Sequence, residues 1–202
     1  MVSRKLLNFS GGIDSTYCLY QALKEGEHLL VHHIHLINYE KRAPLERVAV
    51  TKTRAWLATQ RLPGKYKYIE STFDFGSLGH RVLDVNVWAF FTGVILAGKQ
   101  NQDIDGVIVP RHAEAFIHEP DPIAAAARSD NFLRVFMNTI AHKEVPILLP
   151  IVNMMKEDII KAMPRELLDK CWWCRRPVRN KPCHKCITCV QVDPVLRRIR
   201  NG

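Results

Sequence analysis

Six consecutive residues near the N-terminus, Ser10 to Ser15, combine the residue types that hold a phosphate chain. They read Ser-Gly-Gly-Ile-Asp-Ser, after an apolar stretch at 6–9 and before a helix-like run at 16–24. Paired glycines let the backbone turn tightly, and the following helix presents unpaired N–H groups and the positive end of its dipole. We therefore predict a phosphate-binding loop made of Ser10, Gly11, Gly12, Ile13, Asp14 and Ser15.

The side chains of this loop add chemistry to its backbone. Ser10 and Ser15 are hydroxyl donors, and the carboxylate of Asp14 suits a magnesium ion that shields the phosphates. The loop has neither the lysine of the Gly-Lys-Ser/Thr nucleotide loop nor the spacing of the three-glycine dinucleotide fingerprint. An ordinary Gly-Gly turn is the alternative, but the strand before the loop and the helix after it favour nucleotide binding, with Asp14 and Ser15 as catalytic residues.

A second set of chemically capable residues lies near the C-terminus, where five of the six cysteines fall between residues 171 and 189. Zinc takes four soft ligands in a tetrahedron, and cysteines separated by two residues on a tight turn direct two sulfurs at one ion. Three cysteines form two overlapping pairs of this spacing: Cys183, Cys186 and Cys189. One more sulfur, from Cys174 or Cys171, completes the shell.

Other interpretations of these residues stay open. His184 is a weaker candidate ligand because it lies inside the turn of the first pair. Disulfides are disfavoured, since no signal peptide precedes the cluster and clustered cysteines in a cytosolic chain more often bind metal than pair. A redox or persulfide-carrying role is open to whichever cysteine is spare, with Arg175 and Arg176 as its positive surroundings.

The elements that must position these motifs alternate between strand and helix. We expect strands at 6–9, 29–39, 66–69, 106–109 and 146–152. We expect helices at 16–24, 44–59, within 78–99, at 124–141 and at 156–163, with Pro164 ending or kinking the last. This alternation predicts an α/β fold with a parallel five-stranded sheet and helices on both faces, which binds ligands at the carboxyl ends of its strands.

A change of composition near residues 168–171, from helix periodicity to Cys, Pro and Arg, marks a boundary in the chain. It predicts a nucleotide-binding α/β domain at 1–168 and a small cysteine-rich zinc-binding module at 169–202.

The net charge of +9 is concentrated in that second part, where residues 165–202 hold ten Lys or Arg against three Asp or Glu. Two explanations remain open: arginines that offset the thiolates of a metal site, and an anionic partner such as a nucleic acid. No uncharged apolar run is long enough to span a bilayer, and we expect a cytoplasmic protein without a membrane partner.

The loop Ser10–Ser15 resembles the SGGxDS loop of the ATP pyrophosphatases, the PP-loop enzymes, which split ATP between its α and β phosphates and pass AMP to a substrate oxygen. The resemblance implies ATP and Mg²⁺ as cofactors and a loop that grips pyrophosphate as the leaving group. It also implies the adenine nucleotide alpha hydrolase-like version of the Rossmann-like fold.

Together, the loop and the cysteines resemble the 7-cyano-7-deazaguanine synthase family, whose zinc site follows the spacing C-x8-C-x2-C-x2-C. Cys174, Cys183, Cys186 and Cys189 fit that spacing, so the resemblance implies that they bind Zn²⁺ and that Cys171 is the odd one out. Three further residues match family segments and are predicted to contact the cofactor: Tyr39, Arg42 and Lys156. Glu46 also matches, whereas the segments that form the family's base pocket keep only Asn86 and Arg128.

The resemblance implies a ligase of 7-deazapurine (queuosine-type) biosynthesis, and a homodimer. ATP adenylates the carboxylate of 7-carboxy-7-deazaguanine, ammonia displaces AMP to give an amide, and a second ATP activates the amide oxygen so that a nitrile forms. Two other PP-loop activities remain as alternatives: adenylation of another carboxylate, such as a peptide or protein terminus, and tRNA thiolation. A third, non-enzymatic hypothesis is a zinc knuckle that binds nucleic acid, attached to an inactive nucleotide-binding domain.

Overall fold

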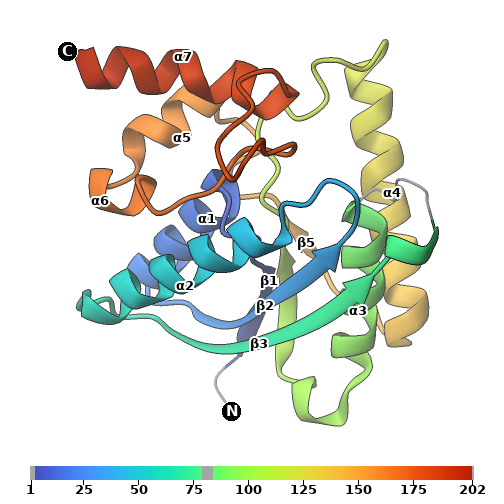
Figure 1. The fold of residues 1–202 in the computed structure, drawn as a ribbon. Helices are drawn as coiled ribbons and strands as arrows, with labels where there is room; N and C mark the ends of the chain where they lie inside the picture. Colours follow the sequence, from blue (N-terminus) through green and yellow to red (C-terminus); the bar gives the residue numbers. More distant parts are fainter. Residues whose placement is uncertain (1–2, 79–83, 202) are drawn as a thin grey trace.

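The computed structural model describes residues 3–78 and 84–201 and has one sheet of five parallel strands (Figure 1). The strands are β1 (Arg4–Asn8), β2 (His28–Ile37), β3 (Lys65–Asp74), β4 (Ile104–Ile108) and β5 (Ile147–Leu148). Their order in the sheet is β3-β2-β1-β4-β5, so the direction in which the chain adds strands reverses between β1 and β4. The predicted Rossmann-like parallel sheet is confirmed.

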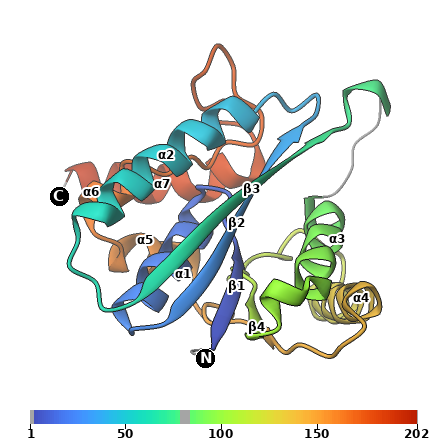
Figure 2. The same cartoon turned by 90° about the horizontal axis from the view of Figure 1, so that it is seen from below.

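Helices cover both faces of this sheet, as Figure 2 shows. One face carries α1 (Ile13–Lys24), α2 (Ala43–Thr59), α5 (Lys156–Ala162), α6 (Arg165–Leu168) and α7 (Ile187–Asn201). The other face carries α3 (Asp84–Ala97) and α4 (Pro122–Ala141). No helix in the described part of the chain combines the length and apolar character needed to cross a membrane.

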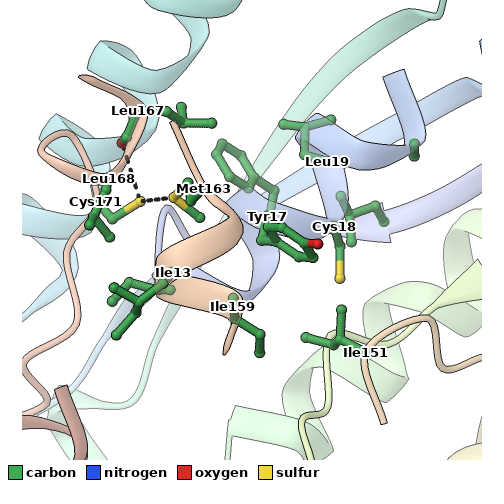
Figure 3. Packing of buried hydrophobic residues seen from close by; sticks show 14 of the residues in the cluster. Ile13, Tyr17, Cys18, Leu19, Ile151, Ile159, Met163, Leu167, Leu168 and Cys171 are labelled. Carbon is green, nitrogen blue, oxygen red and sulfur yellow. Dashed lines mark hydrogen bonds between the residues drawn. The ribbon is translucent and has the colours of Figure 1, made fainter. Parts of the chain in front are cut away.

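Alternation along the strands explains the two cores. Neighbouring strand residues point to opposite faces, so Leu7 enters the core under α1 and α5, whereas Leu6 enters the core under α3 and α4. Figure 3 shows part of the first core, where Ile13 and Tyr17 of α1 meet Ile159 of α5. This packing fixes the start of α1, and therefore the loop before it, against the sheet.

Several boundaries differ from the sequence-based expectation. β5 contains only Ile147 and Leu148 instead of 146–152, because prolines at 146 and 150 leave few N–H groups for a longer ladder. β3 is longer than expected and pairs with β2 over ten positions. α3 covers 84–97 of the expected 78–99, of which 79–83 lie outside the described residues. α7 was missed, since Cys189 and Pro194 obscured its helical periodicity.

Candidate functional site

The loop Ser10–Ser15 leaves the carboxyl end of β1 at the point where the strand order reverses, the place at which open α/β sheets bind ligands. Gly12 caps α1 without a side-chain hydrogen bond, and the first N–H groups of a helix have no partner within it. The Ser10 and Ser15 hydroxyls lie 3.1 Å apart, and the Gly12 N–H donates to Ser10 Oγ at 3.2 Å. A Cβ on Gly12 would lie 3.2 Å from that same oxygen. The loop is a narrow cradle of donors, as a phosphate chain requires.

Gly11 holds the loop against two other parts of the chain. Its φ of +74° is left-handed, and a Cβ there would lie 3.0 Å from Val50 Cγ2 of α2. Its carbonyl accepts a hydrogen bond of 2.9 Å from the Trp172 N–H, in the cysteine-rich segment. Only glycine fits both the backbone conformation and the close approach of α2.

Lys156 reaches the same loop from α5. Its side chain is 3% exposed, and its ammonium group forms an ion pair with Asp14. Lys156 is the first residue of α5, and its backbone N–H, which has no partner within the helix, donates to Glu114 Oε2 at 2.7 Å. The structure therefore brings together two predicted site residues that are 142 positions apart in sequence.

A cleft of about 410 Å³ opens beside the loop. It is lined by most of the predicted cofactor contacts: Ser10, Gly12, Ile13, Asp14, Ser15, Arg42 and Lys156. Gly11 supports the turn from behind through α2 and Trp172. Tyr39 is 55% exposed and is not among the lining residues. Seven predicted positions thus converge on one cleft, and Tyr39 does not join them.

A charged cluster forms one side of the cleft. Arg42 Nε lies 3.0 Å from Glu40 Oε2, its Nη1 lies 3.0 Å from Glu46 Oε1, and it also forms an ion pair with Asp84 at the start of α3. Burial raises the pKa of Glu46 to about 7, although Arg42 opposes that shift. The pKa of Asp84 is lowered, because attraction to Arg42 and Arg175 outweighs its burial. Arg42 therefore holds three carboxyl groups at the cleft wall.

Buried polar side chains form the floor of the cleft on the α3 side. His32 Nδ1 lies 3.2 Å from Asn8 Oδ1 and its Nε2 lies 3.0 Å from Ser71 Oγ, while Asn8 donates to Thr92 Oγ1 at 2.8 Å. Burial lowers the pKa of His32 to about 4, so the ring is neutral at pH 7. Apolar side chains, among them Ile34, Leu36, Val87 and Trp88, surround this floor. A mostly apolar pocket with a few fixed polar groups is the usual form of a small-molecule site.

The four cysteines of the predicted metal site converge at the other side of the cleft. The sulfurs of Cys174, Cys183, Cys186 and Cys189 all lie within 4.8 Å of one another. A tetrahedral zinc ion with Zn–S bonds of about 2.3 Å holds its sulfurs roughly 3.8 Å apart. Cys174 and Cys186 are separated by 4.0 Å. The donor set and its spacing fit a single tetrahedral ion.

Tight turns produce this convergence. His184 has a left-handed φ of 57°, which folds the Cys183–Cys186 turn so that the Cys186 N–H lies 3.3 Å from Cys183 Sγ. The His184 side chain is 61% exposed and contacts Asp193 Oδ2 at 2.7 Å, away from the sulfurs. Burial alone would raise the pKa of Cys186, but backbone N–H groups, including that of Arg175, lower it to about 6. These donors stabilise the thiolate of Cys186, the form that binds metal, whereas burial raises the pKa of Cys174 and Cys189.

Cys171 lies apart from this group. Its Sγ lies 3.9 Å from Met163 Sδ and 3.5 Å from the Leu167 carbonyl oxygen, inside the core drawn in Figure 3. Burial raises its thiol pKa to about 12. A protonated, buried thiol is a poor nucleophile, so the environment of Cys171 is that of a packing residue.

Comparison with known proteins identifies the fold. No family model and no curated protein sequence matches the chain. Among solved structures, the chain is similar to the U34-tRNA thiolase NcsA from Methanococcus maripaludis with its 4Fe-4S cluster, at 13% identity and a TM-score of 0.50. That likeness covers 98% of this chain but 66% of the thiolase, just under two thirds of its length.

The chain is also similar to NMN synthetase from Francisella tularensis, at 14% identity and a TM-score of 0.52, over 98% of this chain and 78% of the synthetase. Both proteins are members of the PP-loop ATP pyrophosphatase superfamily. At these identities the likeness establishes a shared fold.

Sequence reasoning missed several residues of the cleft. Asp84, Trp172 and Trp173 line it, and Arg175 was considered only as a neighbour of a reactive thiol. Their positions depend on where α3 and the cysteine-rich segment pack, which no local pattern encodes. One signal was present, because Trp172 and Arg175 flank Cys174 and must lie close to any metal site built there.

Proposed function

We propose that this chain is an AMP-forming, ATP-dependent enzyme of the PP-loop ATP pyrophosphatase type. The observation that carries the proposal is the loop Ser10–Ser15, with its cradle of donors at the strand-order reversal and a buried lysine paired with its aspartate. The cradle suits pyrophosphate as the leaving group, and Lys156 places a positive charge where negative charge develops. The similar fold of two PP-loop enzymes supports the proposal.

Four residues of the loop have a direct role in this proposal. Ser10, Gly12 and Ser15 bind pyrophosphate, while Asp14 holds Mg²⁺, which neutralises phosphate charge when it is bound. Lys156 then exchanges its ion pair with Asp14 for contacts to the phosphates. Catalysis is positioning and charge stabilisation, so the reaction needs no protein nucleophile.

For the substrate we propose a planar heterocyclic carboxylic acid, with 7-carboxy-7-deazaguanine as the leading candidate. Its carboxylate oxygen attacks the α-phosphorus and pyrophosphate leaves, so that an acyl adenylate forms. Ammonia displaces AMP to give the amide, and a second adenylation on the amide oxygen followed by loss of AMP leaves the nitrile. The apolar wall around Trp88 suits a ring system, and the Asn8 amide, which can make one more bond as donor and one more as acceptor, supports a polar edge on that ring.

We propose Zn²⁺ as the ion of the four-cysteine site. Four thiolates leave no open position for water, so the ion is structural. A cubic iron-sulfur cluster separates its cysteine sulfurs further than one ion does, and the close spacing of the four sulfurs supports a single ion. Metal analysis of the purified protein is expected to find one zinc and no inorganic sulfide per chain.

A second candidate, tRNA thiolation, is favoured by the basic residues 165–202. The environment of Cys171 argues against it, because sulfur transfer through this cysteine needs an accessible thiolate, and its thiol is buried and protonated. If the protein thiolates tRNA through this cysteine, turnover requires tRNA and stops in Cys171→Ala. Amide or nitrile formation requires ammonium instead and tolerates the change. The domain division after residue 168, the homodimer and the nucleic-acid partner stay predictions.

The experiment that tests the substrate is incubation with ATP, Mg²⁺, ammonium and 7-carboxy-7-deazaguanine, followed by mass spectrometry of AMP and the nitrile. Both products are expected, and Asp14→Ala is expected to form neither while it keeps its metal. Absence of both products, in protein that holds one metal and binds ATP, would reject this substrate and leave another carboxylate as acceptor.

A further inference from the structure

The cysteine-rich segment touches the cleft at two points on opposite sides of the site. Trp172 binds the phosphate-binding loop through its N–H, 2.9 Å from the Gly11 carbonyl oxygen. Arg175, three residues later, binds the start of α3, with its Nη2 3.1 Å from Asp84 Oδ2. Cys174 lies between these two contacts in the sequence and is one of the four gathered cysteines. The segment therefore spans the cleft from α1 to α3.

The metal site fixes the backbone of Arg175. The residue directly follows Cys174, and its N–H lies 3.5 Å from the Sγ of Cys186, on the other half of the site. An ion that holds the two sulfurs together also holds the main chain of Arg175 between them. The direction of its side chain toward Asp84 is thus set by the closed metal site.

The guanidinium group of Arg175 completes the charged cluster. Asp84 Oδ2 accepts from both Arg42 and Arg175, and Arg175 also lies 3.6 Å from Glu40 Oε2. Without Arg175, Asp84 Oδ2 keeps Arg42 as its one ion-pair partner among the described residues. A carboxylate that loses one of its partners at a half-buried position is destabilised or moves toward solvent.

We infer that Arg175 is a positioning residue that couples the four-cysteine metal site to the start of α3 and so keeps the cleft in its binding shape. The inference rests on the proposed function only in taking this cleft as the nucleotide and substrate site. It predicts that loss of the metal loosens α3 and weakens ligand binding, because the Arg175–Asp84 ion pair is then no longer held in place.

The first test needs no ligand and compares metal-loaded Arg175→Ala with the wild type by hydrogen exchange of the α3 amides. Arg176→Ala is the matched control, because this adjacent arginine is exposed. Arg175→Ala is expected to keep one metal per chain and to exchange the amides of the second turn of α3 faster, roughly tenfold, whereas Arg176→Ala exchanges as the wild type does. Arg175→Lys, which keeps the charge but not the planar fork, is expected to fall between them. Unchanged α3 exchange in metal-loaded Arg175→Ala, or an equal effect of Arg176→Ala, would overturn the inference.

The second test measures binding of a non-hydrolysable ATP analogue with a methylene bridge between the α and β phosphorus atoms. Metal-loaded Arg175→Ala is expected to bind it roughly tenfold more weakly than the wild type and Arg176→Ala do. Equal affinities of Arg175→Ala and the wild type would overturn the inference. If the wild-type protein binds no analogue, the proposed function is overturned, and the hydrogen-exchange result alone decides whether Arg175 couples the metal site to α3.

Discussion

At the residue scale, the ion pair of Lys156 with Asp14 is the contact that most clearly indicates chemistry. A lysine that is 3% exposed loses its hydration, so the adjacent carboxylate must compensate it. The pair faces a cleft and is not surrounded by core, which makes both charges available to an incoming polyphosphate. The Lys156 side chain is buried by protein and still lines the cleft, because α5 begins beside the loop.

Replacing Lys156 with Met is expected to lower the rate of AMP formation by roughly 100-fold or more, the loss typical when one group that stabilises developing charge is removed. Lys161→Met is the control, since Lys161 lies on the same helix, has a 60% exposed side chain and pairs with Glu157. Steady-state assays of AMP release measure both. A full rate in Lys156→Met would remove the lysine from the mechanism.

A second prediction concerns the buried histidine His33, whose Nδ1 lies 2.8 Å from the Phe9 carbonyl oxygen. Burial lowers its pKa to about 4, opposed by that hydrogen bond, with His35, Glu70 and Arg47 as the nearby charges. The unfolded chain binds a proton near pH 6.5 and the folded chain does not, so stability falls as the pH drops from 6.5 to 4.

In His33→Gln this pH dependence is expected to be shallower, by up to about 1.4 kcal/mol per pH unit within that window. Urea unfolding at several pH values measures the slope. Identical slopes in the two proteins would show that His33 is protonated in the folded state.

Residue types in one short segment were predictable, and pairs across the fold were not. Ser10 to Ser15 could be assigned because six neighbouring positions carry the signal. The contacts of Arg42 and of Arg175 with Asp84 join positions that are 42 and 91 residues apart. Single charged residues have many potential partners, and only the packing of α3 and the cysteine-rich segment selects among them.

At the element scale, the unit of β1, loop and α1 needs a close neighbour to hold its shape. α2 approaches the turn so closely that Val50 occupies the space where a Cβ of residue 11 would lie. The loop geometry is therefore a property of three packed elements rather than of six residues. Strand and helix patterns predicted these elements well, whereas β5, which prolines flank, is shorter than expected and α7, with Pro194 inside it, was not predicted.

Gly11→Ala tests this packing against Gly26→Ala, because both glycines have positive φ but only Gly11 has neighbours near its Cβ position. Gly26→Ala is expected to cost about 1 kcal/mol from backbone strain alone, and Gly11→Ala about 1 kcal/mol more from the contact with Val50. Thermal unfolding measures the difference. Equal losses would mean that α2 moves aside without cost.

At the scale of the whole molecule, the segment that leads into the metal site forms one wall of the cleft. Cys174, Trp172 and Trp173 line it together with the phosphate-binding loop. Val192, Val195 and Leu196 of α7 belong to the same core as α1. The ends of the chain thus build one site, and a sequence that shows two separate motifs does not reveal that they share a cavity.

Replacing Cys174 with Ala is expected to abolish metal binding and to weaken nucleotide binding, because the wall that carries Trp172 and Arg175 loses its anchor. Cys171→Ala is the control and is expected to keep the metal, with a stability loss of about 1 kcal/mol from the lost thiol packing. Metal analysis and nucleotide binding measure both variants. Retained metal in Cys174→Ala would show that this cysteine is not a ligand.

The measurement that tests the central claim most directly is the identity of the phosphate products formed from ATP, read by phosphorus NMR in the presence of Mg²⁺, ammonium and the carboxylate substrate. The loop Ser10–Ser15 with Lys156 predicts AMP and pyrophosphate in equal amounts, and neither in Asp14→Ala. Formation of ADP and inorganic phosphate would contradict the account, because it would mean that the cleft cleaves the terminal phosphate and does not hold pyrophosphate as the leaving group.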